Sequence, residues 1–225
     1  MFKIQYFSKT YLLLFLAVSV LSNAKATRVL SNQTQQQLKL NNELLTAQAE
    51  NGEAKAQYQL FMLYQDEDKA KAMQYLKQAF KQNYPLAIYT KGSMYYHGDG
   101  IKKDVFKGIR LLETSNEYGN VHAAMLLGLI YSKGDNVKKD PQKAFDYFLK
   151  AEAGGYLSAN LFLANAYYRG KGVAQDQNKA LEVMLKAQQA GYIPDQQTMK
   201  EYDLCKLEIR IVNGQDMHTF ECPSL

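Results

Sequence analysis

The feature that most constrains the fold is a 36-residue period in the middle of the sequence. Tyrosines and small residues recur at this spacing in three successive segments: Tyr95, Tyr131 and Tyr167; Gly98, Gly134 and Gly170; Gly119, Gly155 and Gly191; Ala87, Ala123 and Ala159. Self-similarity at a fixed period of this size indicates stacked structural repeats, because one short unit cannot bury its apolar face alone.

An earlier segment shares part of the pattern. An aspartate followed three residues later by a lysine occurs four times at the same period: Asp68 and Lys71, Asp104 and Lys107, Asp140 and Lys143, and Asp176 and Lys179. The first of these segments is five residues shorter, because Tyr64 precedes Asp68 by four residues, whereas Tyr95 precedes Asp104 by nine. We therefore predict four repeats, over residues 53–84, 85–120, 121–156 and 157–192.

Each repeat is predicted to consist of a helix, a turn and a second helix. In the third repeat, apolar residues at helical spacing begin after His122, and Gly134 marks the end of the first helix. Asp140 is a predicted N-cap, because its side chain accepts backbone hydrogen bonds, and Pro141 suits the first helical position. The second helix covers residues 142–153 and ends at two glycines. Small residues on the first helices are expected to let neighbouring helices approach closely: Gly92, Gly128 and Ala164.

The fourth repeat, which contains ANLFLANAYYRGKGVAQDQNKALEVMLKAQQAG, resembles a Sel1-like repeat in its alanine, glycine and Asp-x-x-Lys-Ala positions. The resemblance extends over about residues 53–192, with Asn136 in place of the second glycine of the third turn and Gly108 in place of an alanine. It implies a mainly α fold, a right-handed α-solenoid related to tetratricopeptide arrays, which holds other proteins. Some exported members of this family carry a disulfide in every repeat and have been linked to penicillin binding, but the repeats here contain no cysteine.

The first 26 residues have the three parts of a secretory signal peptide. Lys3 and Lys9 lie at its start, an apolar run covers residues 11–21, and small residues permit cleavage after Ala24 or Ala26. The run is shorter than the roughly 20 apolar residues that a membrane-spanning helix needs. We therefore expect no transmembrane segment in the mature chain, and we predict export to the periplasm of a Gram-negative bacterium. The leader is followed by a predicted flexible segment and N-terminal capping helix, residues 27–52.

The two cysteines of the chain, Cys205 and Cys222, are placed symmetrically about Asn213 and Gly214. Asn-Gly between strand-forming residues predicts a tight β-hairpin, and a turn there puts the cysteines directly opposite each other. Export favours their oxidation to a disulfide, with two free thiols as the alternative. We therefore predict that residues 194–225 form a helix and a disulfide-closed hairpin. The hairpin would cap the last repeat, or its edge would pair with a strand of a partner.

Charge gives no reason to expect a nucleic-acid partner. Loss of Lys3, Lys9 and Lys25 with the signal peptide lowers the formal net charge from +5 to +2. A net charge this close to zero gives no electrostatic attraction to a polyanion on which to base such an expectation.

The sequence also presents no catalytic or metal-binding pattern. The three histidines, His97, His122 and His218, lack the spacing of metal ligands. Residues 170–172 read Gly-Lys-Gly but lack the further glycine and the Ser or Thr of a phosphate loop. We therefore predict no catalytic residue, no metal site and no cofactor.

A protein partner is expected to bind along the concave groove that stacked first helices form. Positions that vary between repeats on these helices carry aromatic, basic and amide side chains, which suit protein recognition. The candidate partner-binding residues are Tyr96, His97, His122, Lys133, Asn165, Tyr168 and Arg169. Ordinary surface and packing between repeats are the alternative, above all for Tyr96 and Tyr168, which lie close to helix ends.

The predicted function is a non-enzymatic scaffold or adaptor of the cell envelope, which acts as a monomer and holds a protein partner in this groove. Two alternatives stay open. A periplasmic immunity or inhibitor protein that neutralises a toxic effector, such as a secreted phospholipase, would resemble other exported Sel1-like proteins. An envelope enzyme or penicillin-interacting Sel1-like protein would need a nucleophile and a base arranged together, which the sequence does not present.

Overall fold

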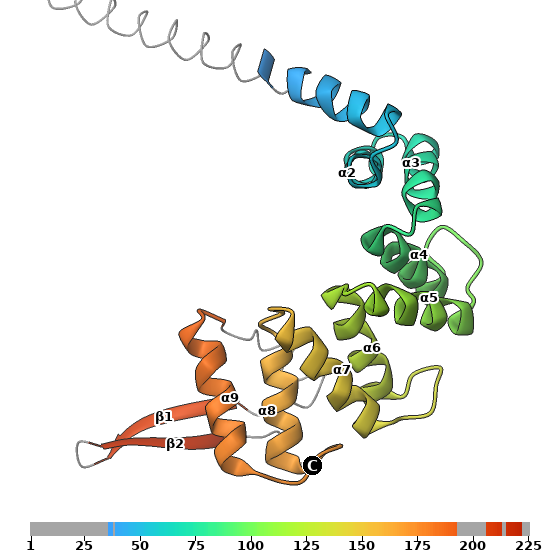
Figure 1. Cartoon of the computed structure of the whole chain (residues 1–225). Helices are drawn as coiled ribbons and strands as arrows, with labels where there is room; N and C mark the ends of the chain where they lie inside the picture. Colours follow the sequence, from blue (N-terminus) through green and yellow to red (C-terminus); the bar gives the residue numbers. More distant parts are fainter. Residues whose placement is uncertain (1–35, 38, 193–205, 213–214, 222–225) are drawn as a thin grey trace, which may run out of the picture. The chain divides into compact units, whose positions relative to one another are not determined.

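The computed structural model describes residues 36–37, 39–192, 206–212 and 215–221, the last two segments by their backbone alone. Helices follow one another along the sequence, and two strands come after them (Figure 1). A helical segment over residues 39–50 comes first. The labelled elements are α2 (Ala54–Tyr64), α3 (Lys69–Lys81), α4 (Pro85–His97), α5 (Val105–Glu117), α6 (Val121–Lys133), α7 (Pro141–Ala153), α8 (Ala159–Arg169), α9 (Gln177–Gln189), β1 (Lys206–Val212) and β2 (Gln215–Glu221).

The chain divides into two compact units, Met1–Ala79 and Phe80–Leu225. In the second unit, extensive contacts join helices that are adjacent in the sequence, from α4 and α5 through to α8 and α9. Each of the pairs α4–α5, α6–α7 and α8–α9 lies within one predicted repeat. This succession of helix pairs is an α-solenoid, which confirms the mainly α part of the predicted fold.

The first unit contains α2, α3 and the helical segment over residues 39–50. Ala49, Ala56 and Leu60 form its buried cluster. The side-chain amide of Gln57 donates a hydrogen bond of 3.0 Å to the carbonyl oxygen of Ala49, which ties α2 to the preceding helix. That helix stops before Gly52, which has a left-handed backbone (φ 92°), at the position where the sequence predicts the end of a capping helix.

The second helix of each repeat begins at an aspartate N-cap, as the sequence predicts. The Asp140 carboxylate accepts a hydrogen bond of 3.0 Å from the backbone amide of Lys143, and Pro141 holds the first helical position. The same bond, also of 3.0 Å, occurs in the other three repeats: Asp68 with Lys71, Asp104 with Lys107, and Asp176 with Lys179. These caps satisfy backbone donors that a helix start otherwise leaves unpaired.

The turns between first and second helices require left-handed backbone at two positions in each of the second, third and fourth repeats. In the third repeat these are Gly134, with φ 80°, and Asn136, with φ 63°. Asparagine is one of the few residues other than glycine that adopts this conformation readily. The replacement of the second turn glycine by Asn136 therefore preserves the turn.

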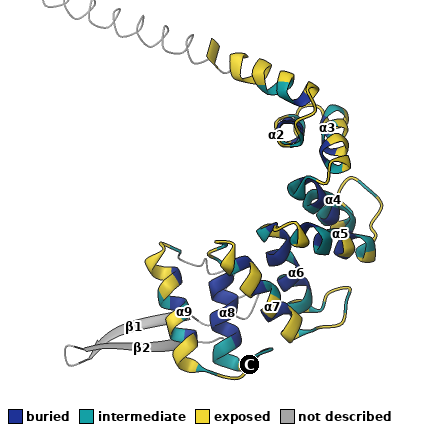
Figure 2. Cartoon of the chain, in the orientation of Figure 1, coloured by how far each residue is buried: buried dark blue, intermediate teal, exposed yellow. Residues whose placement is uncertain are grey.

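Close approach of helices explains the small residues of the second repeat. A Cβ atom added to Gly108 of α5 would lie 2.7 Å from the backbone nitrogen of Tyr96 and 2.8 Å from the carbonyl oxygen of Gly92, both in α4. The two helix backbones thus meet directly, as expected for Gly92, and Leu112 fills the adjacent core with no exposed surface. In the fourth repeat, residues 159–166 of α8 are all buried, which Figure 2 shows along most of this helix.

The two strands pair antiparallel, with Lys206 opposite Glu221 and Val212 opposite Gln215. This is the register that a turn at residues 213–214 produces. The turn itself, both cysteines, residues 194–204 and the predicted signal peptide lie outside the described residues, so the disulfide, the terminal helix and the leader stay predictions. Within the described part of the chain, no helix combines the length and apolar character that crossing a membrane requires.

Candidate functional site

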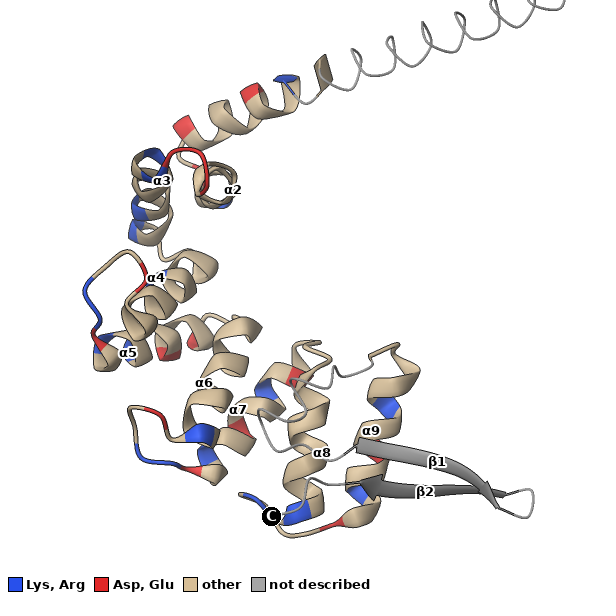
Figure 3. Cartoon of the chain, turned by 180° about the vertical axis from the view of Figure 1, so that it is seen from behind, with Lys and Arg blue, Asp and Glu red and all other residues tan. Residues whose placement is uncertain are grey.

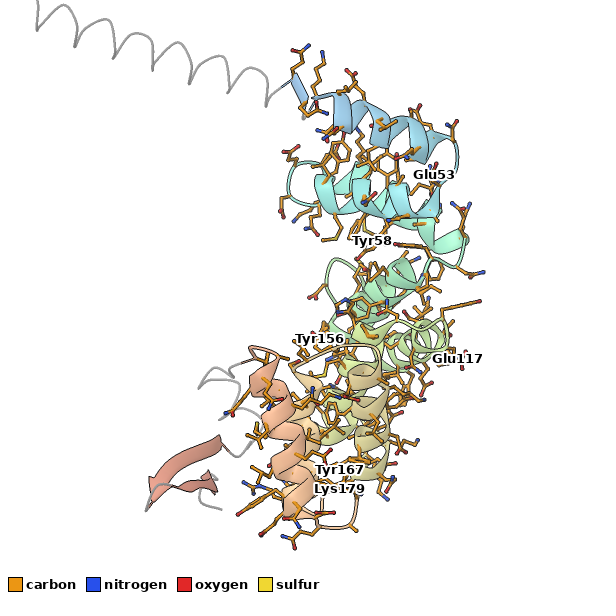
Figure 4. The ribbon with its side chains drawn as sticks, turned by 60° about the vertical axis from the view of Figure 1, so that its left-hand side comes forward. Glu53, Tyr58, Glu117, Tyr156, Tyr167 and Lys179 are labelled. Atoms are coloured by element: carbon orange, nitrogen blue, oxygen red, sulfur yellow. The ribbon has the colours of Figure 1, made fainter. Side chains whose placement is uncertain are left out.

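A contact between tyrosine, aspartate and lysine closes the turn of every repeat. The tyrosine carbonyl accepts a hydrogen bond from the amide of the capping aspartate, at 2.8 or 2.9 Å in all four repeats. The lysine three residues later places its ammonium over the tyrosine ring (Figure 4 labels Tyr167 and Lys179). The distances to the ring centroid are 3.8 Å for Lys71 and Tyr64, 4.1 Å for Lys107 and Tyr95, 5.0 Å for Lys143 and Tyr131, and 5.6 Å for Lys179 and Tyr167.

We call this arrangement the turn clasp: the repeated tyrosine, the capping aspartate and the lysine. It gives the Asp-x-x-Lys pattern a structural role, and it assigns the lysines to a cation–π contact rather than to solvent alone. The clasp fixes where each second helix begins relative to the end of the first. The same contact therefore positions the two helices of every repeat, and with them the surface that each repeat presents.

The clasps differ in their electrostatics. The Lys107 ammonium donates a hydrogen bond of 2.8 Å to the Tyr95 hydroxyl and lowers the pKa of this tyrosine. Burial and the nearby Glu113 carboxylate raise the pKa of Tyr131, whose hydroxyl donates to Glu113 over 3.4 Å. Of these two tyrosines, Tyr95 therefore has the more stable phenolate.

Two of the predicted groove residues are buried in the packing between helices. Tyr96 is 7% exposed, and its hydroxyl donates a hydrogen bond of 3.1 Å to the carbonyl oxygen of Asp135 in the next repeat. Asn165 is also 7% exposed. Burial at these two positions favours the alternative reading, packing between repeats, over direct contact with a partner.

Three predicted residues occupy one equivalent position at the ends of the first helices. His97, Lys133 and Arg169 lie in the last turns of α4, α6 and α8. Positive charge is favourable there because the helix dipole is negative at its C-terminus. His97 also lies edge-on against Tyr96, at 4.9 Å between ring centroids. The neighbouring Tyr168 is half-buried. These residues have structural roles whether or not they bind a partner.

His122 is the predicted residue with the strongest case for recognition. It is exposed at the start of α6, and its ring lies 5.9 Å from that of Tyr89 in α4 and 5.4 Å from that of Tyr156, which precedes α8. We call Tyr89, His122 and Tyr156 the aromatic track. It joins side chains from the second and third repeats, and Tyr156 is the last residue before the fourth. Tyr89 and Tyr156 were not predicted, because no single period relates the three positions.

A cleft of about 830 Å³ lies between α5 and the α6–α7 turn. Phe106 stands at this cleft and is 74% exposed, and Arg110, Lys138 and Lys139 also line it. Figure 3 shows basic residues on the α6–α7 turn. Comparison of second helices between repeats would have revealed Phe106, but the sequence prediction compared the first helices alone.

Metal binding finds no support among the residues that the structure describes, where no three His, Cys, Asp or Glu side chains are placed to hold an ion. His97 and His122 have different neighbours, Tyr96 for the first and the aromatic track for the second.

Comparisons with known proteins agree with this architecture. A family model described as Sel1 repeat matches residues 54–84, 86–117, 121–156 and 157–192. A search of curated proteins gave no match. The structure is similar to that of a protective antigen of uropathogenic Escherichia coli strains with an SLR fold, at 31% identity and a TM-score of 0.62 over 67% of this chain and 33% of that chain.

A Sel1 repeat protein from Oxalobacter formigenes is also similar, at 27% identity and a TM-score of 0.58, over 63% of this chain and 60% of that chain. The present chain thus spans about a third of the first relative and 60% of the second. Because the family model covers most of the helical part, the chain belongs to the Sel1 repeat family, whose repeats serve as scaffolds for protein interaction.

Proposed function

We propose that this protein is a non-enzymatic adaptor of the cell envelope that holds a protein partner on the first helices of its second to fourth repeats. The aromatic track is the observation that carries the proposal. Aromatic side chains contribute much of the binding energy at protein interfaces, because they bury a large area with little loss of conformational freedom. An exposed ring flanked by two others, on a framework fixed by turn clasps, is a suitable anchor for a partner.

The envelope location rests on the predicted signal peptide of residues 1–26. An oxidising compartment would also suit the predicted disulfide between Cys205 and Cys222. We propose the adaptor role rather than a catalytic one because the tyrosines with shifted pKa values belong to turn clasps or to the packing around them. Their shifts arise from Lys107, Glu113 and burial, all of which have structural explanations.

Co-purification of the exported protein from its own envelope extract tests this proposal. The wild-type protein is expected to capture one stoichiometric companion. His122→Ser should weaken the capture about tenfold, the size of loss typical of a contact worth more than 1 kcal/mol. This change introduces the residue that the fourth repeat holds at the equivalent position, Ser158, so it should not disturb folding.

Asn178→Ser, at an exposed position of α9, is the matched control and should leave the capture unchanged. Equal capture by wild type and His122→Ser would place the partner elsewhere and would contradict the proposed surface. The captured protein also separates two roles. An effector whose toxic activity is abolished in the complex would indicate an inhibitor, whereas an envelope assembly protein that stays active would indicate an adaptor.

A further inference from the structure

Phe106 departs from the pattern of its own repeats. It lies in the first turn of α5 and is 74% exposed, the highest value among the large hydrophobic side chains described as exposed. The equivalent positions in the third and fourth repeats are Gln142 and Asn178, both exposed and polar. A polar side chain therefore suffices for the fold at this position. Exposure of a phenylalanine in the second repeat needs an explanation other than packing.

The surroundings of Phe106 form a recess rather than a flat surface. The cleft of about 830 Å³ lies between α5 and the α6–α7 turn, and Ile109 and Val137 add apolar surface to its lining. Volumes of this order accommodate side chains of a peptide or a small ligand. Phe106 thus lines a recess together with other apolar side chains.

The cleft contains more basic than acidic side chains, and the acidic ones already accept hydrogen bonds. Arg110 on α5 and Lys138 and Lys139 on the α6–α7 turn are exposed, and no ion pair joins them to an acid within the described residues. The acids that line the cleft are already engaged. Glu113 accepts a hydrogen bond from the Tyr131 hydroxyl, and Asp140 caps α7. With Lys143 also in the lining, four basic side chains face two acidic ones, so the cleft presents net positive charge.

From this combination we infer that the Phe106 cleft binds an acidic linear segment of a protein partner, with an apolar side chain of that segment against Phe106. The carboxylates of the segment pair with Arg110, Lys138 and Lys139, and Arg110 can bind a carboxylate through two parallel hydrogen bonds. The apolar side chain supplies the affinity that exposed ion pairs alone lack. This inference goes beyond the proposed function, because the cleft shares no residue with the aromatic track.

Fluorescence anisotropy with a short fluorescein-labelled peptide of alternating Glu and Leu tests the inference on the complete exported protein. Two matched peptides serve as probes of mechanism, one of alternating Glu and Ser and one of alternating Lys and Leu. Each variant replaces a residue of the cleft by the residue at the equivalent position of another repeat. Phe106→Gln introduces the residue of the third repeat, and Lys138→Ala combined with Lys139→Gln introduces the residues of the fourth, Ala174 and Gln175.

The Glu-Leu peptide is expected to bind more tightly than either matched peptide. Phe106→Gln should weaken its binding about tenfold, as for an aromatic anchor. The double lysine variant should also weaken the binding of this peptide. Its affinity should depend less on salt concentration, because fewer exposed charge pairs remain for the salt to screen. Lack of binding by the Glu-Leu peptide, equal binding by the Glu-Ser peptide, or unchanged binding by Phe106→Gln would each overturn the inference.

The His122→Ser variant separates this result from the proposed function. It should bind the Glu-Leu peptide with unchanged affinity, and a loss of affinity would contradict a separate cleft. If envelope extract yields no companion but the peptide binds in the expected order, the adaptor proposal fails and the cleft stands. If a companion is captured through the aromatic track but the peptide does not bind, the cleft is overturned and the adaptor proposal stands.

Discussion

The ammonium of Lys71 lies 3.8 Å from the centroid of the Tyr64 ring, although the turn that separates these residues is five residues shorter than its counterparts. The same contact, at 4.1 Å, joins Lys107 and Tyr95 across a full-length turn. Since two turns of different length lead to the same contact, the helix ends are positioned by the clasp and not by the path of the turn between them.

Replacement of Tyr95 tests the turn clasp. Tyr95→Phe keeps the ring beneath the Lys107 ammonium and loses the hydroxyl that accepts its hydrogen bond. Tyr95→Leu removes the ring as well. We expect Tyr95→Leu to lower the free energy of unfolding by about 0.5 kcal/mol more than Tyr95→Phe, the low end of the range for a cation–π contact because the site is solvated. Urea unfolding followed by circular dichroism measures the difference, and equal losses would show that the ring is dispensable.

The hydrogen bond between repeats made by Tyr96 should contribute to stability. Tyr96→Phe removes the hydroxyl that donates to the Asp135 carbonyl and leaves the buried ring in place. We expect a loss of about 1 kcal/mol in the free energy of unfolding. Tyr118→Phe is the control, because Tyr118 is 53% exposed. If Tyr96→Phe were as stable as this control, the hydrogen bond to Asp135 would contribute nothing, and Tyr96 would stabilise the protein through apolar packing alone.

Gly108 should tolerate no larger residue. Alanine there gains helix propensity, worth about 1 kcal/mol in a free helix. Its Cβ atom would nevertheless lie 2.7 Å from the backbone of α4, which cannot move aside as a flexible side chain can. We expect Gly108→Ala to lower the free energy of unfolding by about 1–3 kcal/mol. A melting temperature equal to or above that of the wild type would show that α4 and α5 can separate without cost.

Tyr147 should make the protein sensitive to alkali. Burial and the Glu113 carboxylate raise its pKa to about 12, with Tyr131 and Glu117 contributing, while Lys150 lies over its ring at 5.1 Å. Because the unfolded chain loses this proton near pH 10, the contribution of Tyr147 to stability is complete below that pH and is lost as the pH rises towards 12. The melting temperature of the wild type should therefore fall more steeply than that of Tyr147→Phe above pH 10. Parallel curves would contradict this assignment.

The features predicted correctly from the sequence are those fixed by local chemistry. The N-cap of Asp140 depends on residues within one turn of helix, and the turn conformation of Asn136 depends on its own backbone preference. Each of these could be derived without knowing how the repeats stack.

The candidate site was harder to predict because exposure depends on stacking. Tyr96 occupies a position where the fourth repeat has Tyr168, and yet the former is buried and the latter is half-buried. Tyr96 contacts the turn of the following repeat, because its hydroxyl donates to the Asp135 carbonyl. The aromatic track similarly joins non-equivalent positions of the second and third repeats, so a comparison at one period could not reveal Tyr89 or Tyr156.

The turn clasp has a consequence for protein engineering. Its contacts lie on either side of the turn, and the natural array already contains turns in which the aspartate follows the tyrosine by four residues or by nine. Closing a longer flexible loop adds only about 0.6 kcal/mol for each doubling of its length. We therefore expect the turn between α4 and α5, bounded by Tyr95 and Asp104, to accept an inserted foreign peptide while the helices on both sides keep their places.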